Sequence, residues 1–289
     1  MQPSPDPPFS KITIAGLGLI GGSIALAVRD AWPSVRIAGV DRPAVLAHAL
    51  GSGAIDRGVD TIVAGSDADL IVLAAPVSQN VHLLCDVGPK ISEAAVITDV
   101  GGTKRDIVGA SRSLSLKAPF VGGHPIGGGE RGGFGFARPD LFRARPWILT
   151  PEPDTSPAAV DRLSAFVRRL GAKPAVMTAD DHDRIMGFLS HLPQLTASTL
   201  MEVIGRATSV DGLRLAGRGL VDTTRLASSP SNVWKDVCAA NADAIGAALD
   251  ALIARLSEVR ADLERGDTIE TIFTEAGRWR AELMKGRDV

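Results

Sequence analysis

The chain has 289 residues, of which 45% are hydrophobic and 22% are charged. This length favours two domains over one, and the hydrophobic content is sufficient for a substantial core. The formal net charge is −2 at pH 7, so the charge balance gives no reason to expect a nucleic acid or an acidic membrane surface as a partner.

The N-terminal residues 1–10 are rich in proline and have neither the basic region nor the apolar core of a signal peptide. We expect them to form a flexible arm. No apolar stretch of the sequence reaches the length of a membrane span. The two cysteines, Cys85 and Cys238, lack the spacing of a metal or redox site, which indicates reduced thiols in a cytoplasmic protein.

A glycine-rich turn follows the first predicted strand. The apolar run at residues 12–15 ends in the sequence Gly16-Leu17-Gly18-Leu19-Ile20-Gly21, after which an apolar helical pattern begins. Gly16 is expected to make the tight turn, Gly18 to let the backbone approach a pyrophosphate, and Gly21 to let the helix pack closely on the strand. The N-terminus of that helix would offer free N–H groups to the phosphates. The pattern predicts a dinucleotide cofactor.

Asp41 ends a second apolar run, at residues 35–40, at about the twenty-residue distance expected of an acid that binds ribose hydroxyls. Its carboxylate would repel a 2′-phosphate, which favours NAD over NADP. Arg42 keeps NADP open, because a neighbouring arginine can hold that phosphate. The predicted cofactor-binding residues are Gly16, Gly18, Leu19, Ile20, Gly21, Asp41, Arg42, Ala75, Pro76 and Gly101.

Strands and helices alternate through residues 11–178. Helical patterns occupy residues 23–31, 43–51, 78–88 and 156–170, and apolar runs typical of buried strands occupy residues 70–75, 95–98, 120–121, 146–150 and 175–177. The alternation predicts an α/β fold, a doubly wound parallel (Rossmann) sheet that forms the dinucleotide-binding domain. Residues 122–145 contain too much glycine for regular structure, so we expect a long loop that lines a site.

From Ala179 onward the strand signal disappears. The helical patterns there cover residues 180–208, 210–227, 231–264 and 268–285. We therefore expect an all-helical domain over residues 179–289. Helices this long with little else to cover them indicate a homodimer.

His124 is the first candidate for chemistry. It follows the last clear strand of the cofactor domain, inside the predicted glycine-rich loop, and Pro125 fixes the turn. An imidazole can take a proton from a hydroxyl group while a hydride leaves the same carbon. The alternative is a loop histidine that bonds only to backbone. The chain has no tyrosine, which excludes dehydrogenases that use a Tyr-Lys pair as acid and base.

The first helical segment after residue 178 carries further polar residues. Ser190 and Gln194 are four positions apart and share a helix face. Pro193 removes a hydrogen bond to the preceding turn, which predicts a kink. His182 and His191 fall on different faces with no further ligand to complete a tetrahedral set, so we expect no metal. A capping or packing role is expected for His182.

Arg225 lies among apolar and small residues, in the sequence Asp222-Thr-Thr-Arg225-Leu-Ala-Ser-Ser-Pro230. Arginine is well suited to bidentate carboxylate binding. The alternative is an ion pair with Asp222, three residues earlier.

Five stretches together resemble the prephenate/arogenate dehydrogenase family. They are Gly16-Leu-Gly-Leu-Ile-Gly-Gly-Ser23, Asp99-Val-Gly-Gly-Thr-Lys104, His124-Pro-Ile-Gly-Gly-Gly-Glu130, Ser190-His-Leu-Pro-Gln194 and Thr224-Arg-Leu-Ala-Ser-Ser-Pro230. They follow the family's order over almost the whole chain, and the last three in one sequence are specific.

The resemblance implies NAD-dependent oxidative decarboxylation of prephenate to 4-hydroxyphenylpyruvate, a reaction of tyrosine-type aromatic biosynthesis. A cyclohexadiene loses hydride to NAD, His124 draws off the C4 hydroxyl proton, and the ring carboxylate leaves as carbon dioxide. By family position Arg225 would hold a substrate carboxylate, and Glu130 would lie at the pocket entrance. The other implied substrate-binding residues are Ser190, Gln194, Gly102 and His191. Family members dimerise through the helical domain.

Three positions depart from the family pattern. Gly102 stands where the family usually has a serine that bonds the catalytic histidine and the C4 oxygen, Gly129 replaces a serine or threonine, and Gln194 replaces a histidine. Thr103 or water could fill these gaps. Alternatively, the substrate is arogenate, whose amino acid side chain could suit Gln194, or 4-amino-4-deoxyprephenate, whose C4 amine could suit Gly102.

Two rival classes remain. Hydroxyacid dehydrogenases with a Rossmann domain and a helical domain use a lysine on the first long helix of the second domain, and residues 179–208 contain none. An NAD-binding sensor that lost its activity would explain Gly102, although His124 and Arg225 are retained.

Overall fold

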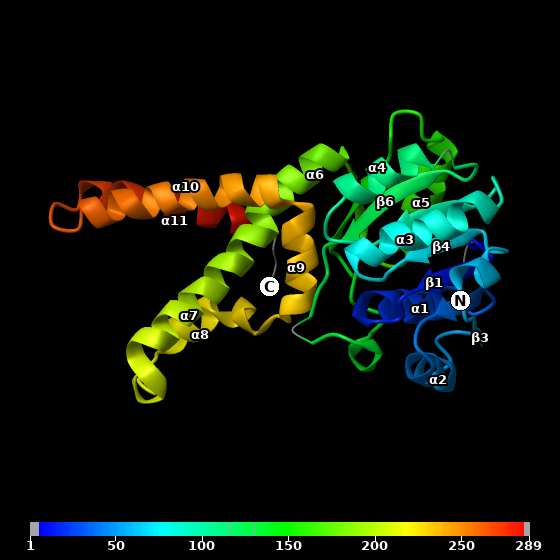
Figure 1. The fold of residues 1–289 in the computed structure, drawn as a ribbon, viewed down its shortest axis with the longest axis horizontal. Coiled ribbons are helices and arrows are strands. Elements are labelled where there is room, and N and C mark those ends of the chain that lie inside the picture. The colour runs from blue at the N-terminus through cyan, green and yellow to red at the C-terminus, as the bar shows by residue number, and fades with distance from the viewer. Residues whose placement is uncertain (1–5, 115, 130, 286–289) are drawn as a thin grey trace. The chain divides into compact units, whose positions relative to one another are not determined.

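The computed structural model describes residues 6–114, 116–129 and 131–285 (Figure 1). The chain forms two compact units, Met1–Ala242 and Asp243–Val289. The first unit contains the β-sheet and every described residue of the predicted site. Part of the expected N-terminal arm is packed rather than free, because Phe9 is 2% exposed and its ring meets the edge of Phe166 at a centroid distance of 5.7 Å.

An eight-stranded sheet with the order β3-β2-β1-β4-β5-β6-β7-β8 forms the centre of the first unit. The strands are β1 Lys11–Ala15, β2 Arg36–Val40, β3 Arg57–Gly58, β4 Leu70–Leu73, β5 Val96–Asp99, β6 Phe120–Pro125, β7 Pro146–Thr150 and β8 Lys173–Val176. The predicted α/β class is confirmed. The predicted parallel sheet has one antiparallel pair, since β7 runs antiparallel to β6. The described residues between these two strands form no α-helix, whereas a parallel pair needs a long crossover connection, usually an α-helix.

Helices cover both faces of the sheet. They are α1 Leu19–Ala31, α2 Pro43–Gly51, α3 Val77–Val87, α4 Arg105–Ser113 and α5 Pro157–Arg169, with short 3₁₀ turns at η1 Ile62–Gly65, η2 Gly88–Lys90 and η3 Phe134–Phe136. In β4, Leu70 and Val72 join the core beneath α1 and α5, whereas Ile71 and Leu73 join the core beneath α3 and α4. Successive strand residues face opposite sides, so the continuous apolar run of β4 is that of a doubly covered strand.

After β8, the described residues up to 285 form helices and no further strand. In the first unit they are α6 Ala179–Met186, the π-helix η4 Gly187–His191, α7 Leu192–Leu213, α8 Arg218–Thr223, the 3₁₀ turn η5 Arg225–Ser228 and α9 Ser231–Ala240. The second unit contains α11 Asp267–Met284 and almost all of α10 Ala242–Ala261.

The helical segments differ from the prediction at three places. The kink expected at Pro193 takes the form of a π-helical turn, because proline cannot donate a backbone hydrogen bond to the preceding turn. Segment 210–227 is two helical pieces and a 3₁₀ turn. The helix expected at 231–264 ends at Asn241, whose backbone leaves the helical region at φ −136° and ψ 34°.

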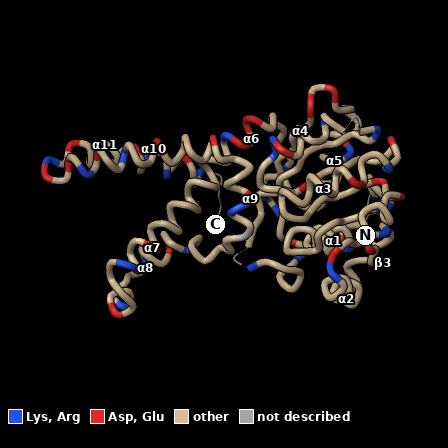
Figure 2. The backbone as a smooth tube through the Cα atoms, viewed as in Figure 1, with Lys and Arg blue, Asp and Glu red and all other residues tan. Residues whose placement is uncertain are grey.

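Acidic and basic residues are interspersed along the traced backbone (Figure 2), in keeping with the small net charge. In the described part of the chain no single helix is long and apolar enough to cross a membrane, although the consecutive segments Val233–Ala240 and Ala242–Ala261 would pass that test if taken together.

Candidate active site

The turn after β1 is built for close backbone contact. Gly16 has φ +96°, and a Cβ on it would lie 2.5 Å from the carbonyl carbon of Ala74. A Cβ on Gly21 would lie 1.9 Å from the carbonyl oxygen of Gly16. A Cβ on Gly18, by contrast, would meet nothing within 4 Å. Gly16 and Gly21 are therefore fixed by packing, whereas Gly18 borders open space into which a ligand could fit.

Helix α1 begins at Leu19, one turn earlier than the sequence pattern indicated, and no side chain caps it. Its first N–H groups therefore keep their capacity to bind an anion, and the helix dipole favours negative charge there. This end of α1 fits the phosphates of a dinucleotide.

Asp41 follows β2 beside the same turn. One carboxylate oxygen accepts a hydrogen bond from the N–H of Leu17 at 2.7 Å, and the other accepts one from the N–H of Arg42 at 2.7 Å. The Arg42 side chain is 86% exposed, with its Nε 3.9 Å from the carboxylate. Asp41 is thus held in place with acceptor capacity left for ribose hydroxyls.

A buried amide supports the segment that follows β4. Asn80 accepts a hydrogen bond from the N–H of Ala75 at 3.0 Å, next to Pro76. Its Nδ2 is buried and has no partner among the residues that the structure describes. Sequence reasoning missed Asn80, since an isolated asparagine in a helix carries no distinctive signal.

His124 lies in strand β6, which corrects its expected place in a loop. Gly122 and Gly123 are strand residues paired with β7. A Cβ on Gly122 would lie 2.3 Å from Thr150 Oγ1, and one on Gly123 would lie 2.5 Å from the carbonyl oxygen of Asp99. These glycines serve close strand packing rather than loop flexibility, and they leave His124 on a rigid element.

His182 contacts His124 directly. The distance from His124 Nδ1 to His182 Nε2 is 2.8 Å, and that from His182 Nδ1 to Asp183 Oδ1 is 2.7 Å. Of the two roles expected for His182, capping is wrong, because Thr178 caps α6 by accepting a hydrogen bond from the N–H of Asp181 at 3.1 Å. The side chain is fully buried, as a packing role requires. The adjacent pair His182-Asp183 at a helix start was the available sequence signal.

The Asp183 carboxylate, which belongs to α6, accepts hydrogen bonds from the backbone at the start of α4. Its Oδ1 accepts a hydrogen bond from the N–H of Lys104 at 2.8 Å, and its Oδ2 accepts from the N–H of Arg105 at 2.9 Å and from Arg105 Nε at 3.3 Å. Burial raises the pKa of Asp183, but the hydrogen bonds from His182, Arg105 and Lys104 outweigh it and lower that pKa below its usual value. The carboxylate is therefore charged at neutral pH.

A buried ion pair lies beside this network. The Lys104 ammonium contacts the Asp99 carboxylate, and the two side chains are 0% and 1% exposed. The carboxylate also accepts hydrogen bonds from the N–H groups of Gly101 at 2.8 Å and Gly123 at 3.0 Å. Asp99 thereby ties the end of β5 to the strand that carries His124.

His124 is neutral at physiological pH. Burial of its ring nitrogens, together with the neighbouring His182, Lys104 and His191, lowers the pKa of His124 well below 6.5. The residue as a whole is nevertheless only half-buried, so part of its surface reaches solvent. A neutral, accessible imidazole can accept a proton, as a general base requires.

The predicted substrate residues fall into two sets. Gln194 and His191 are 5% and 2% exposed. Gln194 Nε2 donates to the carbonyl oxygen of Leu226 at 2.7 Å, and His191 Nδ1 lies 3.2 Å from Asn241 Nδ2. Both side chains thus connect protein segments, and their contact with substrate stays a prediction.

The second set is more exposed. Ser190 is half-buried in η4, and Arg225 opens η5 with an exposed side chain. Asp222, the alternative ion-pair partner expected for Arg225, has its Oδ2 3.7 Å from Arg218 Nε. Glu130 lies outside the described residues.

Gly102 borders free space. A Cβ on Gly102 would meet only Val237 Cγ2, at 3.9 Å. Thr103 does not replace the missing serine, because its Oγ1 is buried without a partner among the residues that the structure describes. The site therefore has room for a side chain that this sequence lacks.

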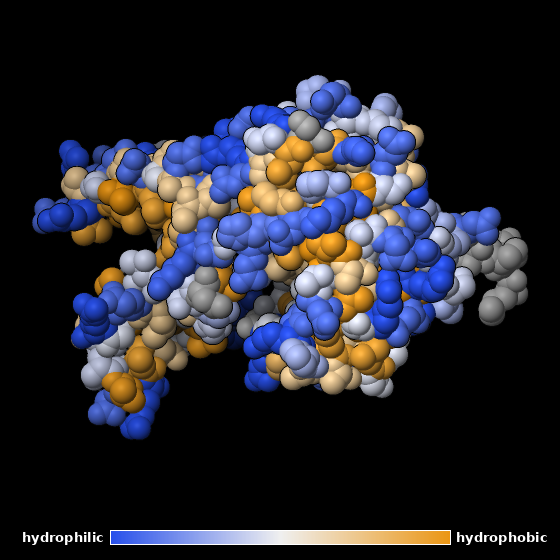
Figure 3. All heavy atoms as spheres, turned by 45° about the vertical axis from the view of Figure 1, so that its right-hand side comes forward, coloured by the Kyte–Doolittle hydropathy of each residue, from blue (hydrophilic) through white to orange (hydrophobic). Residues whose placement is uncertain are grey.

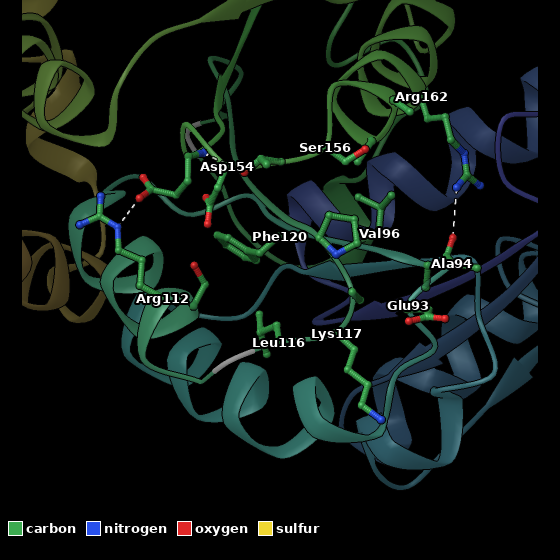
Figure 4. A pocket seen from close by; sticks show the side chains of 18 residues that line it. Glu93, Ala94, Val96, Arg112, Leu116, Lys117, Phe120, Asp154, Ser156 and Arg162 are labelled. Atoms are coloured by element: carbon green, nitrogen blue, oxygen red, sulfur yellow. Dashed lines mark hydrogen bonds and ion pairs between the residues drawn. The ribbon is translucent and has the colours of Figure 1, made fainter.

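A separate cavity of about 630 Å³ lies at the opposite end of the strands, beside Val96 and Phe120 (Figure 4). Arg112 and Glu152 pair across one side of it, and Arg162 donates to the carbonyl oxygen of Ala94 at 3.1 Å. None of the predicted site residues lines it. Within the described ranges, no group of three or more His, Cys, Asp or Glu residues could hold a metal ion.

The glycine turn follows the carboxyl end of β1, and His124 lies at the carboxyl end of β6. Because β1, β4, β5 and β6 run parallel, both lie at the same edge of the sheet, where α/β folds bind their ligands. An imidazole base and a dinucleotide turn at one edge are the parts of a dehydrogenase that removes a hydride and a proton from the same substrate carbon. The fold and the site together therefore define a dinucleotide-dependent dehydrogenase.

Comparison with known proteins identifies the family. The family models for the prephenate dehydrogenase nucleotide-binding domain and dimerization domain match residues 24–176 and 178–274. The chain is 35% identical over 270 residues to prephenate dehydrogenase of Bacillus subtilis (strain 168), covering 91% of this chain and 72% of that protein. It is 30% identical over 292 residues to cyclohexadienyl dehydrogenase of Zymomonas mobilis, covering 97% and 98%.

Solved structures of similar fold lead to the same family. Prephenate dehydrogenase from Aquifex aeolicus, in complex with hydroxyphenyl propionate and NAD+, superposes with a TM-score of 0.87 at 26% identity, covering 95% of this chain and 98% of that one. Synechocystis arogenate dehydrogenase gives a TM-score of 0.79 at 26% identity, covering 94% and 99%. The chain belongs to the prephenate dehydrogenase family, which confirms the predicted resemblance.

Proposed function

We propose that this protein catalyses the oxidative decarboxylation of prephenate to 4-hydroxyphenylpyruvate with NAD. The observation that carries the proposal is the neutral, accessible imidazole of His124 at the sheet edge that also holds the glycine turn. NAD, when bound, supplies the acceptor for the hydride from C4 of the ring. The cofactor fits the uncapped start of α1, the open face of Gly18 and the anchored carboxylate of Asp41.

The protein residues handle the proton and the carboxylates. His124 accepts the proton of the C4 hydroxyl group as that carbon becomes a carbonyl-like centre. The electron pair of the bond to the departing carboxylate enters the ring, which becomes aromatic and releases carbon dioxide. Arg225 holds a substrate carboxylate, and Ser190 orients the ring. Because aromatisation drives the reaction, the protein contributes mainly orientation and charge stabilisation.

A second substrate has a specific observation in its favour. Gly102 lacks the serine hydroxyl that the family usually places next to C4, and open space borders it instead. An amine at C4 could suit this position, so 4-amino-4-deoxyprephenate is the alternative substrate. Arogenate, which keeps the C4 hydroxyl, is the other candidate.

The deciding experiment measures kcat/KM with NAD for prephenate, arogenate and 4-amino-4-deoxyprephenate, following NADH absorbance. We expect prephenate to have the highest value. A higher value for either other substrate would reassign the specificity, and no turnover with any of the three would favour an NAD-binding sensor.

We further propose a homodimer formed through the helical region, with a domain boundary near residue 178. Large apolar side chains are exposed on the helices (Figure 3), among them Leu189 at 70%, Val210 at 70% and Phe273 at 75%. Large apolar side chains exposed on helices favour contact with another protein surface. Light scattering should give twice the 30.1 kDa mass of one chain, and a monomer at micromolar concentration would contradict the proposal.

We place the protein in the cytoplasm. Cys85 and Cys238 are free thiols, which fits a reducing compartment.

A further inference from the structure

His124 is the first of three side chains that form a hydrogen-bonded line into the protein interior. His182 and Asp183 are both 0% exposed, and the two contacts that connect the line measure 2.8 Å and 2.7 Å. Nothing in the proton transfer described above uses His182 or Asp183. A buried histidine and carboxylate in series with a general base require an explanation.

The hydrogen-bond pattern fixes where the protons lie. Asp183 is charged and only accepts, so His182 Nδ1 must carry a proton that it donates to Asp183 Oδ1. A neutral His182 then presents the lone pair of its Nε2 to His124. It follows that His124 carries its proton on Nδ1 and donates it to His182. The remaining nitrogen of His124, Nε2, has a free lone pair.

This arrangement also has room for a transferred proton. If His182 becomes cationic, its charge lies 2.7 Å from the Asp183 carboxylate, which is itself anchored by Lys104 and Arg105. The other charged and titratable groups around the two imidazoles are Lys104, Asp99 and His191. Burial and, to a smaller extent, the Lys104 charge lower the pKa of His182, whereas the hydrogen bond and charge of Asp183 and the charge of Asp99 raise it. The Lys104 ammonium is itself paired with Asp99.

We propose that His182 and Asp183 form a proton relay behind His124, an inference that rests on the proposed function. When His124 Nε2 takes the hydroxyl proton of the substrate, the Nδ1 proton of His124 moves to His182 Nε2. One proton enters His124 and one leaves it, so His124 ends neutral and the positive charge rests on His182 beside Asp183. After product release the protons return by the same steps and leave from His124 Nε2 through the emptied substrate site. His182 is thus a positioning residue and a proton acceptor once removed from the substrate.

Two substitutions separate relay from simple orientation. In His182→Gln the amide oxygen can stand where Nε2 stood and still accept the His124 Nδ1 hydrogen bond, but an amide cannot take up a proton. His182→Asn is too short to reach His124. We expect kcat to fall about tenfold or more in His182→Gln and by about a hundredfold or more in His182→Asn, within the range of general-base contributions, with KM nearly unchanged in both.

The matched control is His82→Gln on α3, because His82 is exposed and outside the site. It should keep the wild-type kcat. A His182→Gln variant with wild-type kcat and an unchanged pH profile would overturn the relay and leave only an orienting contact.

A second readout does not depend on turnover. Nitrogen-15 NMR of the imidazole rings in the full-length protein, with the five histidines assigned by substitution, reports which ring nitrogen carries each proton. We expect a proton on Nδ1 of both His124 and His182. A proton on Nε2 of either ring in the neutral state would refute the relay. If none of the three candidate substrates is turned over, the proposed function fails. The NMR measurement still decides whether Nδ1 of His124 and of His182 carries the proton.

Discussion

Restoring a serine at Gly102 is the sharpest test of how this site recognises C4 of its substrate. Gly102 borders open space, since a Cβ there would have Val237 Cγ2 as its nearest neighbour at 3.9 Å, an ordinary van der Waals contact. Gly102→Ser should therefore fold normally, with a change in unfolding free energy within about 0.5 kcal/mol, as for other unstrained substitutions.

The expected effect on catalysis follows from one hydrogen bond. A serine hydroxyl at this position would bond the C4 oxygen of a substrate, and a typical net hydrogen bond of about 1 kcal/mol corresponds to about fivefold in kcat/KM. Prephenate and arogenate share the C4 hydroxyl group and should gain together. 4-Amino-4-deoxyprephenate lacks it and should gain nothing.

The assay compares kcat/KM of Gly102→Ser and wild type for the three substrates, with thermal unfolding measured in parallel. Gly109→Ser serves as the control, because Gly109 lies on α4 with no atom within 4 Å of an added Cβ. Equal changes for all three substrates, or a loss for prephenate with stability intact, would refute the reasoning that the space at Gly102 adjoins C4.

Three further predictions concern other parts of the site. His124→Asn should retain NAD affinity in a fluorescence titration but lose about a thousandfold in kcat, as expected of a general base; an unchanged kcat would remove His124 from its role. Asp41→Ala should reduce the ratio of NAD to NADP kcat/KM, because the carboxylate that meets the ribose hydroxyls is gone; wild-type enzyme that already prefers NADP would contradict this assignment. Burial lowers the pKa of His191 to about 4, so the unfolded chain binds a proton that the folded protein rejects between pH 6.5 and 4. Stability should therefore be full above pH 6.5 and decrease as the pH falls toward 4, and His191→Gln should weaken this dependence; equal melting curves for variant and wild type across this range would disprove it.

The nucleotide half of the site could be predicted from sequence because its signals are local. Gly16 and Gly21 make the close backbone approaches that the spacing indicated. Asp41 lies beside them, held by the N–H of Leu17, and its contact with ribose stays a prediction. The direction of β7 could not be predicted, since an apolar run does not encode whether a strand runs parallel or antiparallel to its neighbour.

The proton-handling half was only partly accessible from sequence. The sequence identified His124, but the glycines around it predicted a loop. Gly122 and Gly123 instead lie in β6, where Thr150 and Asp99 leave no room for a Cβ. His182 could not be connected to His124, because that contact joins residues 58 positions apart. Pairings of this kind depend on tertiary packing, which a single sequence does not display.

Asp183 belongs to α6 by sequence, yet it supplies the acceptors for the first N–H groups of α4. The amide protons of Lys104 and Arg105 can therefore exchange with solvent only when α6 detaches, which makes the two helices one cooperative unit of local unfolding. A molecule in which this unit opens keeps its nucleotide turn while its base is disconnected, so cofactor retention and catalytic competence can be lost at different temperatures.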